Sequence, residues 1–304
     1  MAPQFDVTPE KEGSVPSFFY RQLTYTPSPV TGVSLAGKTA IVTGSNTGVG
    51  LETSRQLLEL GVSKLILAVR NEEKGNAAVA NLSKGKDLKD VAIEVWPLDH
   101  DSYDSVVAFA DRCKTLDRMD IAVLNVALVL TKFDTNKNTG HCETTQVNYL
   151  STALLMTLLL PIAKAKRANQ DGPSRITMVS SDVSSWTSFK EKTNVPLFPA
   201  LDKGAANPTD RMMVSKLLGQ FFITELAKRV PPTVAVLNCA TPGMVHDSEF
   251  NRDVDKTMGG KIAKVFMRRI GYTAVVGARH ITDAAVKHGE ETHGHYLSQQ
   301  KIKP

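Results

Sequence analysis

The sequence predicts a single α/β domain, in which a parallel sheet of about seven strands is covered by helices on both faces, a doubly wound arrangement. Short apolar runs of strand character alternate with segments of helical character along most of the chain. The runs are apolar throughout, which is typical of strands buried on both faces of a parallel sheet. No internal repeat or change of composition divides the chain into two domains.

The predicted elements alternate through the first three quarters of the chain. The apolar runs that indicate strands are Thr39–Gly44, Lys64–Val69, Val91–Leu98, Ile121–Asn125, Arg175–Ser180 and Thr233–Asn238. The segments that indicate helices are Gly50–Gly61, Glu73–Gly85, Ser105–Leu116, Asn148–Leu160 and Ser215–Arg229. Residues 1–36 contain clustered Pro, Ser and Thr without a helical pattern and are interpreted as an N-terminal extension, which leaves residues 37–304 as the folded domain.

Charge and cysteine content argue against several classes of function. The net charge is +5 and the pI is near 9.0, but Lys and Arg are scattered, so no nucleic-acid-binding surface is indicated. Cys113, Cys142 and Cys239 lie far apart without CxxC spacing, which predicts neither a disulfide framework nor a zinc site. His293 and His295 alternate like strand residues and lack a third ligand, so no metal site is expected.

No segment reads as a membrane anchor. The N-terminus has acids and prolines where a signal peptide requires an apolar core. The longest apolar run, Ala153–Ala163, is too short to span a bilayer and contains Pro161. We therefore expect a soluble, cytoplasmic protein with reduced cysteines. The sequence leaves open whether the chain forms a homo-oligomer.

The first predicted strand runs into a glycine-rich segment, TGSNTGVG, at residues 43–50. In doubly wound folds, ligands bind at the carboxyl ends of the strands. This glycine spacing allows a tight turn, close approach to a pyrophosphate and entry into a helix whose N-terminus attracts phosphate. A glycine triplet alone marks any strand-to-helix turn, but its place between a strand and a helix favours dinucleotide binding. The expected cofactor contacts are Gly44, Ser45, Asn46, Gly48, Val49 and Gly50.

Two side chains after the second and third strands bear on which dinucleotide binds. Arg70 stands where a binder of the unphosphorylated cofactor typically has an acid, and an arginine there can pair with a 2′-phosphate. Arg70 therefore indicates NADP(H), the alternative being a solvated surface arginine. Asp99 is placed either to accept a hydrogen bond from the adenine amino group or to cap the next helix at Ser102.

Taken in order, these motifs resemble the short-chain dehydrogenases/reductases, a Rossmann-type family, over residues 35–304. The glycine loop resembles the family's TGxxxGxG motif, and AVRN at residues 68–71 resembles its NADP-binding, retinol-dehydrogenase-like members. The segments SFFYRQLTYTP and GEETHGHYLS resemble fungal secondary-metabolism members. The resemblance implies cofactor contacts from Asn125 in LNVA, Lys216, Pro242, Gly243 and Val245, and a catalytic set of Asn148, Ser181 and Lys216.

The chain departs from the resemblance at one catalytic position. The family motif YxxxK places a tyrosine four residues before the lysine, whereas MMVSK places Met212 before Lys216. A neighbouring ammonium stabilises a phenolate and makes tyrosine a usable acid, but a thioether holds no proton. Loss of a positioned general acid costs about 10² to 10⁴ in rate. We expect the cofactor-binding scaffold to be retained and the usual proton donor to be absent.

Asp182 and His246 are the candidates that could replace the tyrosine as proton source. Asp182 follows Ser181 and could act as an acid in an apolar cleft, although a solvated loop aspartate is the favoured alternative. His246, in PGMVHD, suits proton transfer near neutral pH and is ranked slightly ahead of Asp182.

Two apolar segments, residues 186–211 and 246–273, are expected to form the walls of a substrate cleft. Their large apolar residues are Trp186, Phe189, Leu197, Phe198, Phe250, Met258, Phe266 and Met267. They favour a small hydrophobic substrate, with simple packing of the loops as the alternative. Three functions remain open: an NADP(H)-dependent reductase of a secondary metabolite with a non-standard proton source, a non-redox isomerase or cyclase, and a non-catalytic NADP(H)-binding protein.

Overall fold

A computed structural model of the chain describes residues 5–203, 207–248, 250 and 253–304. Its strands are β1 Thr39–Thr43, β2 Lys64–Val69, β3 Ala92–Pro97, β4 Ile121–Leu124, β5 Ser174–Val179, β6 Ala235–Ala240, β7 Tyr296–Ser298 and β8 Lys301–Lys303. They form one eight-stranded sheet in the order β3-β2-β1-β4-β5-β6-β7-β8. Pairing is parallel from β3 to β7, and β8 pairs with β7 in the antiparallel direction. The doubly wound α/β prediction is confirmed, with one antiparallel edge strand added.

Each of the six predicted strands is present, and β2 has the predicted bounds. The largest shift concerns β6, which begins at Ala235 rather than Thr233. The backbone N–H of Val234 donates to the carbonyl of Pro231, so a turn occupies the residues before the strand. The terminal pair β7 and β8 was not among the predicted elements, because strands of three residues are too short to show a pattern.

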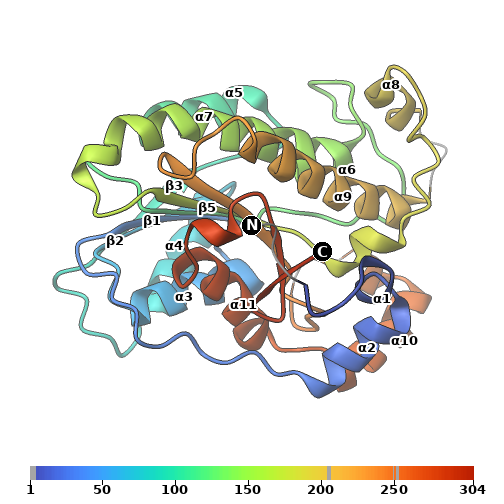
Figure 1. Ribbon diagram of the computed structural model, residues 1–304, viewed down its shortest axis with the longest axis horizontal. Coiled ribbons are helices and arrows are strands. Elements are labelled where there is room, and N and C mark those ends of the chain that lie inside the picture. Colours follow the sequence, from blue (N-terminus) through green and yellow to red (C-terminus); the bar gives the residue numbers. More distant parts are fainter. Residues whose placement is uncertain (1–4, 204–206, 249, 251–252) are drawn as a thin grey trace.

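Helices cover both faces of the sheet (Figure 1). The helices of the main body are α3 Gly48–Glu59, α4 Glu72–Ser83, α5 Tyr103–Cys113, α6 Glu143–Thr145, α7 Ser151–Lys166, α8 Leu197–Leu201, α9 Pro208–Ala227, α10 Met258–Ile270 and α11 Ala274–Val286. Helices α5, α7 and α9 pack on one face through Val106, Leu155 and Ile223. Helices α3, α4 and α11 pack on the other face. The sheet thereby becomes the buried centre of the domain.

One helical segment, residues 143–169, is long and apolar enough by composition to cross a membrane. It is 27 residues long because the chain is helical on both sides of the apolar run 153–163 and continues past Pro161. However, 61% of its most apolar window is buried inside the domain. Leu155 and Leu159 pack against the sheet. The segment is therefore the core helix of an α/β domain.

The N-terminal extension contains two helices, α1 Pro9–Glu12 and α2 Val15–Thr24, which corrects the prediction that it has no helix. Ser14 caps α2 by accepting a hydrogen bond from the backbone N–H of Ser17. Phe18 and Gln22, one turn apart, are buried on the same face. That face packs on the main body, where the Phe18 ring meets Trp186 edge to face with centroids 5.1 Å apart. A helix start signal and one apolar face were present in the sequence but were obscured by the neighbouring prolines.

Candidate active site

The glycine-rich loop after β1 has a backbone that only glycine adopts without strain. Gly44 and Gly48 have φ values of +63° and +57°, in the left-handed region. A Cβ on Gly50 would lie 2.4 Å from the carbonyl oxygen of Gly44, inside van der Waals contact. The loop therefore turns back on itself at the carboxyl end of the first strand and leads directly into α3.

Asn125, at the end of β4, fastens this loop to the neighbouring strand. Its side-chain amide donates to the carbonyls of Thr43 and Gly44 at 3.1 and 3.2 Å. In return the hydroxyl of Thr43 accepts hydrogen bonds from the backbone N–H groups of Asn125 and Val126 at 2.9 and 3.2 Å. The side-chain amide of Asn125 thus holds the loop in place by donating hydrogen bonds to two of its backbone carbonyls.

The loop has the properties required to hold a dinucleotide phosphate. The hydroxyl of Ser45 is fully buried and has no hydrogen-bond partner among the described residues. Thr47 begins α3 without a side-chain cap, and the first turn of this helix carries no acid. Its N-terminal N–H groups and the positive end of its dipole are left for an anion. Asn46 is partly exposed beside them, and Val49 is buried under the loop.

Arg70 and Asp99 lie at the adjoining edge, and a third residue links them. The guanidinium of Arg70 is 57% exposed and donates to the Asp101 carboxylate at 2.9 Å. The carboxylate of Asp99 accepts from the backbone N–H of Asp101 at 3.0 Å. Ser102 caps α5 with its own hydroxyl, so the alternative role of Asp99 as a helix cap was wrong. Asp99 instead shapes the turn that presents Asp101 to Arg70.

Asn148 lies in a π-helical turn, Gln146–Leu150, that precedes α7. Its side-chain amide exchanges hydrogen bonds with the backbone of Leu128, donating at 3.0 Å and accepting at 2.8 Å. The same amide nitrogen donates to the hydroxyl of Ser215 at 3.1 Å. Asn148 therefore ties the segment after β4 to α9 at the residue next to Lys216. Such π-turns occur frequently at functional sites.

Lys216 is the buried cation of the site. Its ammonium donates to the carbonyl of Val179, the last residue of β5, at 2.7 Å. Burial lowers the pKa of Lys216 to about 8, against a smaller opposing effect of the Cys239 thiol. Met212 precedes it by one turn of α9 and is 8% exposed. Ser181 lies two residues beyond Val179 and is partly exposed. The structure thus gathers the predicted lysine, asparagine and serine around the carboxyl ends of β4 and β5.

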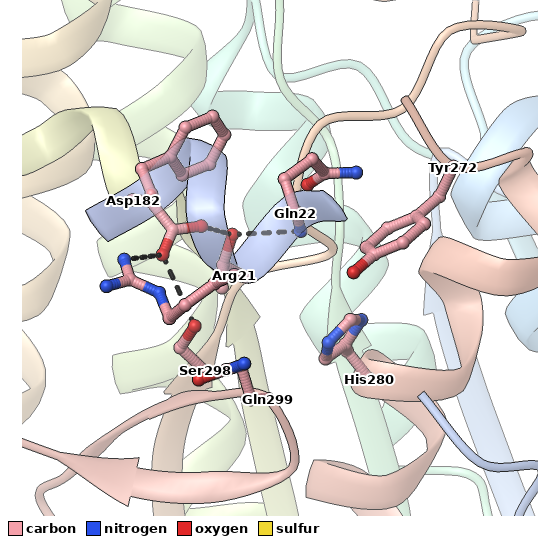
Figure 2. A pocket seen from close by; sticks show the side chains of 10 residues that line it. Arg21, Gln22, Asp182, Tyr272, His280, Ser298 and Gln299 are labelled. Carbon is pink, nitrogen blue, oxygen red and sulfur yellow. Dashed lines mark hydrogen bonds and ion pairs between the residues drawn. The ribbon is translucent and has the colours of Figure 1, made fainter. Parts of the chain in front are cut away.

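Asp182, the first candidate for a proton source, is held by neighbours and is not solvated (Figure 2). Its carboxylate accepts from the hydroxyls of Thr241 at 2.7 Å and Ser298 at 3.3 Å. The guanidinium of Arg21, from α2, lies 3.6 Å from the same carboxylate. The side chain is 8% exposed, so the expectation of a solvated loop aspartate was wrong. Asp182 therefore anchors the loop that begins at Ser181.

His246 and the segment before it follow β6. Gly243 has a φ of +70°, and Val245 forms a parallel bridge with Tyr272. The backbone N–H of His246 donates to the carbonyl of Tyr272 at 3.0 Å. A Cβ on Gly277 of α11 would lie 3.1 Å from the carbonyl of Pro242, so this helix packs closely under the segment. The described contacts assign no proton-transfer role to His246.

The apolar residues expected to wall a cleft divide into two groups. Phe189 forms a cluster with Leu201, Val214 and Leu218, and Leu197 and Phe198 pack against it, so these residues attach the loop to α9. On α10 the side chains are exposed instead, Met258 by 80% and Phe266 by 53%. These exposed side chains of α10 are open to a ligand.

Sequence reasoning missed Arg21, Gln22 and Asp101. A small pocket is lined by Arg21, Gln22 and Asp182, together with residues of the β6 loop and α11 (Figure 2). Arg21 and Gln22 belong to the extension that was expected to lack structure. Their buried positions follow from the helical spacing of Phe18 and Gln22, which is the signal that could have revealed them.

Comparison with known proteins agrees with this geometry. Residues 38–191 match the family model of the short chain dehydrogenases. The chain is 46% identical to the short-chain dehydrogenase fogG of Aspergillus ruber, covering 100% of this chain and 89% of that protein. It is 40% identical to the short chain dehydrogenase sol3 of Alternaria solani, covering 96% and 99%. A solved complex of Pseudomonas aeruginosa RhlG with NADP is 22% identical, with a TM-score of 0.62 over 87% of this chain and 95% of that one, which supports the fold.

Proposed function

We propose that this chain, which belongs to the short-chain dehydrogenase family, is an NADP(H)-dependent reductase of a small hydrophobic metabolite that uses a non-standard proton source. The observation that carries the proposal is the joint presence of a glycine loop fit for a dinucleotide phosphate and a buried lysine beside Ser181 and Asn148. Burying an ammonium is costly, so a buried ammonium at the carboxyl edge of the sheet favours a functional role over a purely structural one.

The cofactor would lie along the carboxyl edge of the sheet, with its phosphates at the glycine loop. The residues proposed to hold it are Gly44, Ser45, Asn46, Gly48, Val49, Gly50, Arg70, Asp99, Asn125, Lys216, Pro242, Gly243 and Val245. Arg70 would exchange its exposed partner Asp101 for a 2′-phosphate, since an arginine fork pairs well with phosphate oxygens. RhlG was solved in complex with NADP, which supports the same class of cofactor for this chain. When bound, the nicotinamide supplies hydride to the substrate.

The proton requires a different source because residue 212 is methionine. Ser181 would polarise a substrate oxygen, but an unaided hydroxyl is too weak an acid to replace a tyrosine. Lys216 is a candidate at this edge because burial lowers its pKa to about 8, closer to working pH than an ordinary lysine. We assign the proton to the Lys216 ammonium, which would transfer it to the substrate oxygen directly or through one water molecule. Asn148 keeps α9 and its lysine in register with the segment after β4.

The test is NADPH consumption by the unaltered protein against a panel of hydrophobic ketones, activated enones and iminium ions. Turnover should be fastest with substrates that need little acid help, and Ser181→Ala should lower it if that hydroxyl polarises the oxygen. Met212→Ala should leave it nearly unchanged. Unchanged turnover in Ser181→Ala would argue against a carbonyl-directed role for this serine.

A non-redox isomerase or cyclase is the second candidate, favoured by the buried thioether at position 212, where no proton can be held. It predicts product formation without NADPH consumption. Binding of NADPH with neither outcome would indicate a non-catalytic binding protein. The buried, free thiols of Cys113, Cys142 and Cys239 support a reducing, cytoplasmic setting, and assembly into a homo-oligomer remains a proposal.

A further inference from the structure

Helix α2 places two adjacent side chains against the two loops that form the catalytic half of the site. Arg21 approaches Asp182, the neighbour of Ser181. Gln22 is 6% exposed and reaches the segment after β6, more than two hundred residues further along the chain. An element outside the doubly wound body therefore contacts both loops at once (Figure 2).

The side-chain amide of Gln22 pairs with both backbone groups of Met244. Its Oε1 accepts from the Met244 N–H at 3.0 Å, and its Nε2 donates to the Met244 carbonyl at 3.3 Å. This two-sided pairing reproduces what a neighbouring strand would provide, and it fixes the orientation of the peptide groups on either side of Met244. Gly243 before it is in the left-handed region, and Val245 after it is paired with Tyr272.

Gln22 also contacts the end of α10 and packs closely against Gly243. Its Nε2 donates to the carbonyl of Ile270, the last residue of α10, at 3.1 Å. A Cβ on Gly243 would lie 3.0 Å from Gln22 Oε1 and 2.9 Å from the ring of Tyr272. The position of the loop is thus set by a close fit between Gln22, Gly243 and Tyr272.

We propose that Gln22 is a positioning residue that sets the backbone of Gly243, Met244 and Val245 against the nicotinamide end of the cofactor. This rests on the proposed function, in which the backbone at Val245 meets the nicotinamide amide. Replacing Gln22 by alanine removes the partner of the Met244 N–H and of the Ile270 carbonyl, while the Met244 carbonyl keeps the N–H of Tyr272 as its partner. The effect should fall on the nicotinamide end, because the adenine end is held by the glycine loop and Arg70.

Calorimetric titration of the full chain with two ligands separates these ends. The affinity for NADPH depends on both ends of the site, whereas the affinity for 2′-phospho-ADP-ribose, which lacks the nicotinamide, depends on the adenine end alone. For Gln22→Ala we expect NADPH affinity to fall about five- to tenfold and affinity for the shorter ligand to change less than about twofold. Gln22→Glu keeps the size but sets a carboxylate against two carbonyls, so it should act in the same direction. Leu23→Ala, on the exposed side of the same helix at 64% exposure, is the matched control and should change neither.

The outcomes distinguish this inference from the proposed function. Equal weakening of both ligands in the Gln22 variants, or no weakening of either, would overturn the positioning role while leaving NADPH binding by the unaltered protein intact. Failure of the unaltered protein to bind NADPH would overturn both. Thermal unfolding shows whether each variant is folded, and if Gln22→Ala is not, Gln22→Glu decides the matter.

Discussion

The two halves of the carboxyl edge of the sheet are held in place by different parts of the chain. The glycine loop after β1 is fixed by its own backbone and by Asn125 from the adjacent strand. The loops after β5 and β6 are instead fixed by Arg21 and Gln22, from a helix that precedes the sheet. The fold alone therefore builds the half that is proposed to bind the cofactor phosphates (the phosphate half), whereas the half that is proposed for catalysis depends on an added segment. Changes in the two halves should have separable effects.

The largest effect is expected when the ion pairs of α2 are broken. Arg21 lies 3.3 Å from Glu12 and 3.6 Å from Asp182, and all three side chains are at most 12% exposed. Arg21→Met removes the cation and leaves two buried carboxylates, which should destabilise the protein by about 3 kcal/mol. Urea unfolding measures this as a lower midpoint with an unchanged slope.

The control for that change is Lys114→Met, which breaks an ion pair whose side chains are 66% and 57% exposed. It should leave the unfolding midpoint nearly unchanged, because exposed pairs contribute little. A similar small change in Arg21→Met would show that α2 contributes no more to stability than a surface element.

The second change tests the phosphate half. Gly50→Ala sets a Cβ 2.4 Å from the Gly44 carbonyl, so the loop must open at a cost of about 1 to 3 kcal/mol. We expect NADPH affinity to fall at least tenfold, as measured by calorimetry, with α2 unaffected. Gly172→Ala, where no atom lies within 4 Å of the added Cβ, is the matched control and should bind normally. Normal binding by Gly50→Ala would mean that the loop does not hold the phosphates.

The third change concerns cofactor choice at Arg70. If its guanidinium leaves Asp101 for a 2′-phosphate, NADPH should bind at least tenfold more tightly than NADH, about 1.4 kcal/mol. Arg70→Asp should remove most of that preference. Lys89→Asp, a comparable charge change at a side chain that is 86% exposed, should not. Equal affinity of the unaltered protein for both nucleotides would contradict the assignment.

The fourth prediction is a pH dependence carried by Lys216. Because burial lowers its pKa to about 8, the ammonium that is proposed to supply the proton is present below that pH and lost above it. The value of kcat/KM for reduction should be level below pH 8 and fall by about tenfold per pH unit above it. The unfolded chain keeps this proton up to its ordinary pKa of 10.5, so this group makes the free energy of unfolding rise between pH 8 and 10.5. A flat profile through pH 9 would exclude Lys216 as the acid.

The sequence predicted the central sheet well because its strands are buried on both faces and read as uninterrupted apolar runs. It placed Lys216, Asn148 and Ser181 together because parallel strands end at one edge. It failed where a residue's role depends on a distant partner. Asp182 reads as a loop aspartate until Arg21 of the extension lies against it, and no local pattern records that contact.

The role of Asn125 shows the same limit at shorter range. Its position at the end of β4 predicts a cofactor contact, and the structure adds that its side-chain amide holds the glycine loop. Residue type and strand position can place a side chain at a site, but the direction in which it points depends on the neighbouring strand. The apolar residues of the 186–211 segment differ from expectation for a related reason, since apolar character does not distinguish a cleft wall from packing between a loop and α9.

The most direct measurement restores the missing acid. Met212→Tyr places a phenol one helical turn from Lys216, and the added ring costs about 1 to 3 kcal/mol if the site is tightly packed. If the acid is the only defect, the variant should gain NADPH-dependent reduction of simple ketones by about 10² or more. Adding Lys216→Ala should abolish that gain. A folded, NADPH-binding Met212→Tyr protein with no gain would contradict the reductase proposal and favour a non-redox enzyme.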